Sequence, residues 1–134
     1  MKILGIEHVA VAVDEVEEPV RVFEQLLGIT DRATEEVPDQ QVTTEIFDTG
    51  GGKVELLRAT SPDAPITRFL KRHGPGLHHI AFLVDDLPAW LNYLSSKGVE
   101  LIDRRPRPGA QGHLIAFLHP RSTAGVLVEL CQKP

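Results

Sequence analysis

Two stretches of the chain share one pattern of hydrophobic and polar positions. Residues 6–13 read IEHVAVAV and residues 77–84 read LHHIAFLV. Each is an almost continuous apolar run with a histidine at the same place, which is typical of a buried β-strand. Self-similarity over so long a period indicates a duplicated supersecondary unit rather than an array of short repeats. We therefore predict two related modules.

A helical pattern and then extended segments follow each of these strands. Apolar positions recur at three- and four-residue spacing over 16–27, with Pro19 in an early turn and Gly28 as the stop. The second module has the same pattern over 87–97. The segments predicted to be extended are 29–36, 42–47 and 54–57 in the first module, and 99–104, 113–118 and 125–131 in the second.

These elements predict an α+β fold made of two tandem βαβββ modules. Module one covers about 3–57, module two covers about 77–131, and a linker of about 58–76 with a short helical piece joins them. Two half-open sheets each have one face to bury, so we expect them to form a curved, partly open mixed sheet around a trough. The whole chain, residues 1–134, is then a single domain.

The modules also place similar chemical groups at matching positions. His8 and His79 belong to the repeated strands, and Glu55 and Glu129 interrupt the last strand of each module. A carboxylate buried there without a partner would cost at least several kcal/mol of desolvation free energy. Imidazoles and carboxylates together suit a divalent metal ion, and four such ligands leave two positions open in a six-coordinate ion. The alternatives are hydrogen-bonded structural histidines and glutamates that face solvent from edge strands.

Composition excludes several classes of function. The chain has 134 residues, with 19 acidic against 14 basic side chains and a net charge of −5, and it has no basic run for nucleic acid. No apolar stretch approaches the roughly 20 residues that cross a membrane, and no signal-peptide pattern begins the chain. The single cysteine, Cys131, cannot form an internal disulfide and is predicted to be a buried, inert thiol. We expect a cytoplasmic protein.

Several motifs resemble the vicinal oxygen chelate superfamily and, within it, the methylmalonyl-CoA epimerase family. They are GLHHIAF with the following VDD (76–86), GVELID (98–103), FLHPRS (117–122) and GVLVEL (125–130), and the resemblance covers almost the whole chain. The superfamily's glyoxalase I is similar in its His and Glu ligands but carries Asp-Pro where this chain has His119-Pro120. The resemblance implies an isomerase that interconverts the R and S forms of methylmalonyl-CoA by proton abstraction and an enolate.

The same resemblance implies a metal centre. His8, His79 and Glu129 match the family's ligands, and Glu55 occupies the place of the fourth. The expected cofactor is a divalent ion, cobalt first, with nickel, manganese and zinc as alternatives. The expected partners are methylmalonyl-CoA and a second copy of the chain in a homodimer.

Two catalytic bases are also implied, one for each face of the reacting carbon. The candidates are Glu129 and Glu45. Glu45 is two positions from Phe47 and so points to the same side of the strand. It aligns with the family's catalytic base only if a one-residue insertion is allowed. An alignment without that insertion puts Thr44 at this place, and a threonine hydroxyl has no useful basicity at neutral pH.

Three other functions are compatible with the scaffold. A glyoxalase I-type lyase would act on a glutathione hemithioacetal with the same four ligands, and the His119-Pro120 pair argues against it. An extradiol dioxygenase keeps two His and one Glu, and Glu55 as a fourth ligand would crowd its open positions. A non-enzymatic small-molecule-binding protein commonly lacks the ligands that this chain retains.

Overall fold

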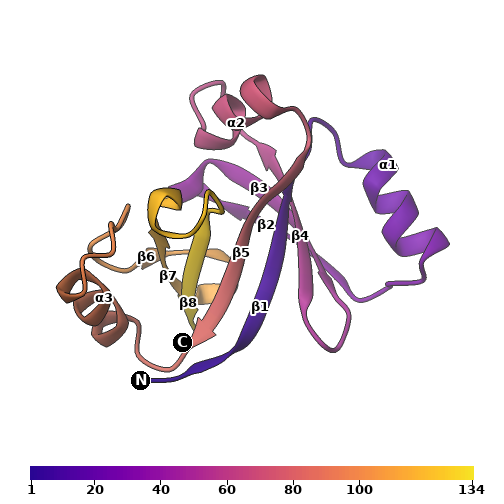
Figure 1. Ribbon diagram of the computed structural model, residues 1–134. Helices are drawn as coiled ribbons and strands as arrows, with labels where there is room; N and C mark the ends of the chain where they lie inside the picture. Colours follow the sequence, from indigo (N-terminus) through magenta and orange to yellow (C-terminus); the bar gives the residue numbers. More distant parts are fainter. The chain divides into compact units, whose positions relative to one another are not determined.

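The computed structural model describes residues 1–134, which divide into two compact units (Figure 1). We call residues 8–78 the N-terminal unit, and residues 79–134 together with 1–7 the C-terminal unit. The boundary falls inside two strands, because the first residues of the chain group with its second half. No helix in the structure is long and apolar enough to span a membrane.

The N-terminal unit is a mixed sheet with strand order β2-β3-β4-β1. Strand β3 is antiparallel to both β2 and β4, and β1 runs parallel to β4. Gly28, whose φ of 73° favours glycine, follows the first helical segment. The elements are β1 (Ile3–Ala12), α1 (Glu17–Val20) continued by a π-helical segment (Arg21–Leu26), β2 (Arg32–Val37), β3 (Val42–Asp48), β4 (Lys53–Ala59) and α2 (Pro65–His73).

The C-terminal unit repeats this plan with strand order β5-β8-β7-β6. Strand β5 runs parallel to β8, and β7 is antiparallel to both β8 and β6. Helix α3 begins after Asp86, whose carboxylate accepts a hydrogen bond from the backbone N–H of Ala89 at 3.0 Å. The elements are β5 (Gly76–Val84), α3 (Leu87–Ser96), β6 (Arg107–Pro108), β7 (Leu114–Leu118) and β8 (Val128–Gln132).

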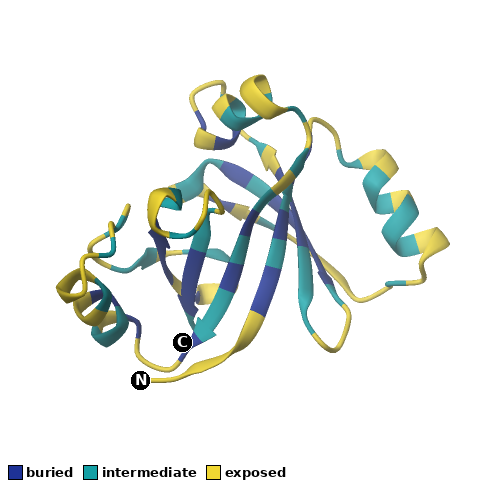
Figure 2. Ribbon diagram, viewed as in Figure 1, coloured by how far each residue is buried: buried dark blue, intermediate teal, exposed yellow.

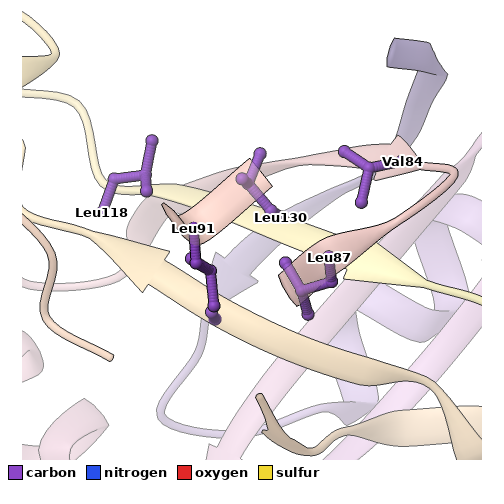
Figure 3. Packing of buried hydrophobic residues seen from close by; sticks show 6 residues of the cluster. Val84, Leu87, Leu91, Leu118 and Leu130 are labelled. Carbon is purple, nitrogen blue, oxygen red and sulfur yellow. The ribbon is translucent and has the colours of Figure 1, made fainter. Parts of the chain in front are cut away.

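Each sheet buries one face under its helix. In the C-terminal unit, leucines of α3 pack on Val84, Leu118 and Leu130 (Figure 3). In the N-terminal unit, Phe47 and Leu56 lie beneath the first helical segment, where Phe23 meets Phe47 edge to face with ring centroids 5.5 Å apart. Much of the dark blue of Figure 2 accordingly lies on strands. The opposite face of each sheet is left for other groups.

Two predicted strands differ from the structure. The stretch 99–104 forms only an isolated bridge, between Leu101 and Leu118, and the short β6 follows it. The last strand begins at Val128 rather than at residue 125, because Ala124 and Gly125 adopt left-handed φ angles of 58° and 84° in a turn. The repeated order of strand, helix and antiparallel strands is otherwise as predicted.

Candidate metal centre

In the N-terminal unit, the parallel pairing of β1 with β4 brings a histidine to a glutamate. Ala10 lies opposite Glu55, and alternation puts His8, two residues earlier, on the same face. His8 Nδ1 is 3.0 Å from Glu55 Oε2, and both side chains are buried. The Thr44 hydroxyl approaches the other carboxylate oxygen at 3.5 Å. The result is a buried imidazole–carboxylate pair on the face away from the helix.

The C-terminal unit builds the same pair from β5 and β8. Ala81 lies opposite Glu129, and His79 again stands two residues before the alanine. His79 Nε2 is 3.2 Å from Glu129 Oε2, and both residues are only 3 % exposed. The rings of His79 and Phe117 are nearly perpendicular, with centroids 5.2 Å apart. Matching register in the two units shows that the duplication extends to these side chains.

The burial of both glutamates excludes the alternative that they face solvent from edge strands. Glu55 and Glu129 do not face solvent from edge strands, since β4 and β8 each have a neighbour on both sides within their own unit. In each unit a buried carboxylate lies beside an imidazole nitrogen, and both groups are ligand types that borderline divalent cations accept. The structure therefore brings the four predicted ligands into two pairs, His8 with Glu55 and His79 with Glu129.

Glu45 occupies the other face of the N-terminal sheet. It pairs with Leu56 in the β3–β4 ladder, and Leu56 packs under the helix. Its carboxylate accepts hydrogen bonds from Arg32 Nη1 at 2.9 Å and from the Thr34 hydroxyl at 2.6 Å. Carboxylate contacts with Glu24 and Glu45 raise the pKa of Arg32.

This placement corrects the interpretation of residue 45. Glu45 was favoured because it lies on the same face of its strand as Phe47. Phe47 belongs to the core that the helix covers, so Glu45 lies on the face opposite to that of His8 and Glu55. Thr44 is on that face. The register therefore supports the alignment without an insertion.

A third group of polar side chains lies wholly within the C-terminal unit. Glu7, His113 and Cys131 are all buried, and His113 Nδ1 is 3.3 Å from Cys131 Sγ. One ligand atom from each residue lies within 4.8 Å of the other two. The predicted burial of Cys131 is confirmed, but its proximity to Glu7 and His113 was not predicted. A signal was present, because Cys131 follows Glu129 by two strand positions and must share its face.

Comparison with known proteins shows the family to which the chain belongs. The model of the Glyoxalase/Bleomycin resistance protein/Dioxygenase superfamily matches residues 7–117. The chain belongs to this superfamily. The predicted resemblance to the superfamily is thereby confirmed.

Individual proteins match almost the whole chain. An uncharacterized protein of Bacillus subtilis is 43 % identical, over 95 % of this chain and 91 % of its own length. The Cereibacter sphaeroides protein named ethylmalonyl-CoA/methylmalonyl-CoA epimerase is 34 % identical, over 95 % of this chain and 96 % of its own length. A variant of the Streptomyces coelicolor methylmalonyl-CoA epimerase, solved with 2-nitronate-propionyl-CoA, is 30 % identical with a TM-score of 0.91. This match covers 98 % of this chain and 99 % of the other. These matches confirm the predicted glyoxalase-like fold class.

Proposed function

We propose that the protein epimerises methylmalonyl-CoA, interconverting its R and S forms. The protein is an isomerase of the superfamily, as relatives named epimerases match nearly the whole chain. The reaction removes the proton from the carbon between the thioester and the carboxylate and returns a proton to the opposite face. The observation that carries the proposal is the buried His–Glu pair repeated in identical register, a donor set suited to a metal-assisted enolisation.

We propose that the two pairs are ligands of one divalent ion. His8 and Glu55 would supply one half of the set, and His79 and Glu129 the other. Cobalt is the first candidate, and nickel, manganese and zinc are alternatives. When bound, such an ion supplies Lewis-acid stabilisation of negative charge that develops on the substrate's oxygens. What supports a single shared ion is the equivalence of the two pairs by repeat position and strand register.

Glu129 is the proposed base for one face of the carbon. A carboxylate oxygen takes the α-proton while the electrons of the C–H bond move toward the thioester carbonyl, and a proton then returns from the other side. Phe117, which packs against the partner imidazole of His79, helps to exclude water from this carboxylate. The second base is a group other than Glu45, because Glu45 lies on the helix-covered face and is engaged with Arg32.

The decisive experiment follows exchange of the α-proton. Methylmalonyl-CoA is incubated in D₂O with the metal-loaded protein, and deuterium uptake is measured together with loss of optical purity. We expect both to require metal and to stop on chelation. Glu129→Gln should lower the exchange rate by at least about 100-fold, the usual contribution of a general base, while Glu100→Gln, an exposed glutamate of the same unit, is the control.

The outcomes distinguish the proposal from its competitors. Bound metal without exchange of methylmalonyl-CoA or ethylmalonyl-CoA would overturn the substrate assignment and leave the metal proposal standing. Conversion of a glutathione hemithioacetal would then identify a lyase. Exchange that persists undiminished after chelation would overturn the metal dependence.

We also propose that the protein is a homodimer. The sheets of the two units end in edge strands, β2 in one and β6 in the other, whose backbone groups a second copy could cover. Light scattering on the purified protein distinguishes a dimer from a monomer directly.

A further inference from the structure

The C-terminal unit contains a cluster that the epimerase proposal does not use. Glu7 comes from β1, His113 directly precedes β7, and Cys131 lies in β8. Their potential ligand atoms lie within 4.8 Å of one another, and none of the three residues is more than 8 % exposed. We propose that these residues form a second, thiolate-containing metal site suited to Zn²⁺.

Comparison with the N-terminal unit shows that the fold does not require polar residues here. The ladder pairs Ile115 with Cys131 just as it pairs Thr44 with Leu57. The position equivalent to Cys131 is thus Leu57, and the one equivalent to His113 is Val42. Both Val42 and Leu57 are buried apolar side chains. The C-terminal unit therefore keeps a thiol and an imidazole at two positions where the equivalent backbone of the N-terminal unit accommodates hydrocarbon.

The donor set and its spacing suit zinc. Cysteine sulfur, histidine nitrogen and a carboxylate oxygen are the three ligand types that Zn²⁺ binds most often, at about 2.0–2.3 Å. Two such ligands on a tetrahedral ion are then about 3.5 Å apart, and His113 Nδ1 and Cys131 Sγ stand at 3.3 Å. A fourth position would remain for water. Binding releases the thiol proton to solvent.

The site would join three segments that are distant in sequence. Glu7 belongs to the first strand, which otherwise continues into the N-terminal unit, while His113 and Cys131 belong to the antiparallel hairpin of β7 and β8. A metal bound to all three closes the long loops between them and so stabilises the folded unit. The bound ion would be shielded from bulk solvent, because none of its three protein ligands is more than 8 % exposed.

Cobalt substitution tests the proposal without a variant. A thiolate bound to Co²⁺ gives an intense near-ultraviolet charge-transfer band, which imidazole and carboxylate ligands do not give. Cys131 is the only cysteine of the chain, so in a buffer without thiols the band can arise only from this residue. We expect the folded protein to bind two Co²⁺ per chain and to develop the band with one of them.

Variants then assign the other ligands. Cys131→Ser should abolish the band, and His113→Ala should lower the cobalt affinity measured by the band at least about tenfold. His119→Ala, which removes a more exposed imidazole of the same unit, should leave the band unchanged. Absence of the band in folded, cobalt-saturated wild-type protein would overturn the proposal, and so would a band that appears only after unfolding. The result is independent of epimerase activity, since the His–Glu pairs contain no sulfur.

Discussion

The two units keep the same His–Glu pair and differ on the face that their helices cover. Glu45 and Ala116 occupy equivalent ladder positions, opposite Leu56 and Leu130. In the C-terminal unit this position is part of an apolar core under α3, and Ala116 is fully buried. In the N-terminal unit it carries a carboxylate held by Arg32. The duplication has therefore preserved the His–Glu pair itself, while the position under the helix has diverged.

This difference shows how buried carboxylates in this scaffold can be assigned to a metal site or to an ion pair. Glu45 and Glu55 are both buried acids of one sheet, but Glu55 faces an imidazole and Glu45 faces a guanidinium that also contacts Glu24. The first environment is the one proposed for a metal ligand, and the second is an ion-pair network. The face of the strand, rather than burial or residue type, separates the two environments.

The largest effects should come from breaking either His–Glu pair. If both pairs hold one ion, His8→Ala and His79→Ala should each lower metal affinity at least about 100-fold, more than the loss of an outer-shell group. Proton exchange should fall with it. Metal content after dialysis and the exchange rate in D₂O measure both quantities, and His73→Ala, at an exposed position, is the control. Retention of a tightly bound ion by one variant alone would show that the two pairs do not share it.

Equivalent core leucines test whether the two units are equally important for stability. Leu56 and Leu130 are 1 % and 3 % exposed and occupy the same place under their helices. Leu56→Ala and Leu130→Ala should each lower the free energy of unfolding by about 2–5 kcal/mol, measured in urea. The exposed Leu26→Ala should change it by less than about 0.5 kcal/mol. A cost below about 1 kcal/mol for only one core variant would break the equivalence.

A smaller effect separates Thr44 from Glu45. Thr44→Val removes a hydroxyl that approaches Glu55, so metal affinity should fall up to about tenfold, as for an outer-shell group. Glu45→Gln should leave the exchange rate within about threefold of wild type, because its carboxylate lies on the opposite face. Its cost should appear instead as about 1–3 kcal/mol of stability, through the weakened bond to Arg32. Loss of exchange at normal metal affinity in Glu45→Gln would restore Glu45 as a base.

The repeated strands predicted the architecture well because their pattern is strong and local. An apolar run, an amphipathic helix and a glycine stop recur in both halves, and each half folds into the predicted order. The stretch 99–104 was predicted to be extended on the same grounds but makes only one bridge. Its pairing depends on the position of a partner strand, which the pattern of a single segment does not contain.

The His–Glu pairs were predictable from the sequence, whereas the faces of neighbouring residues were only partly so. The repeat singles out His8 and His79, and alternation then limits which side chains can join them. One uncertain residue in the alignment moved Glu45 to the wrong face, since adjacent strand positions point in opposite directions. The cluster at Cys131 was missed because Glu7 and His113 are far away in the sequence, and only the folded C-terminal unit brings them together.

The smallest effect concerns Asp85, which follows β5 as Asp14 follows the equivalent run in the N-terminal unit. The backbone N–H of Lys2 donates to Asp85 Oδ1 at 2.8 Å and lowers the pKa of this carboxyl. A lowered pKa in the folded state stabilises the protein above the ordinary carboxyl pKa, and this contribution disappears as the pH falls through the folded-state value. Asp85→Asn should therefore destabilise the protein near neutral pH, with a deficit that shrinks on acidification in urea titrations. Asp14→Asn removes the same charge from the matching position, and an equal, equally pH-dependent loss there would show that the contact with Lys2 is not the cause.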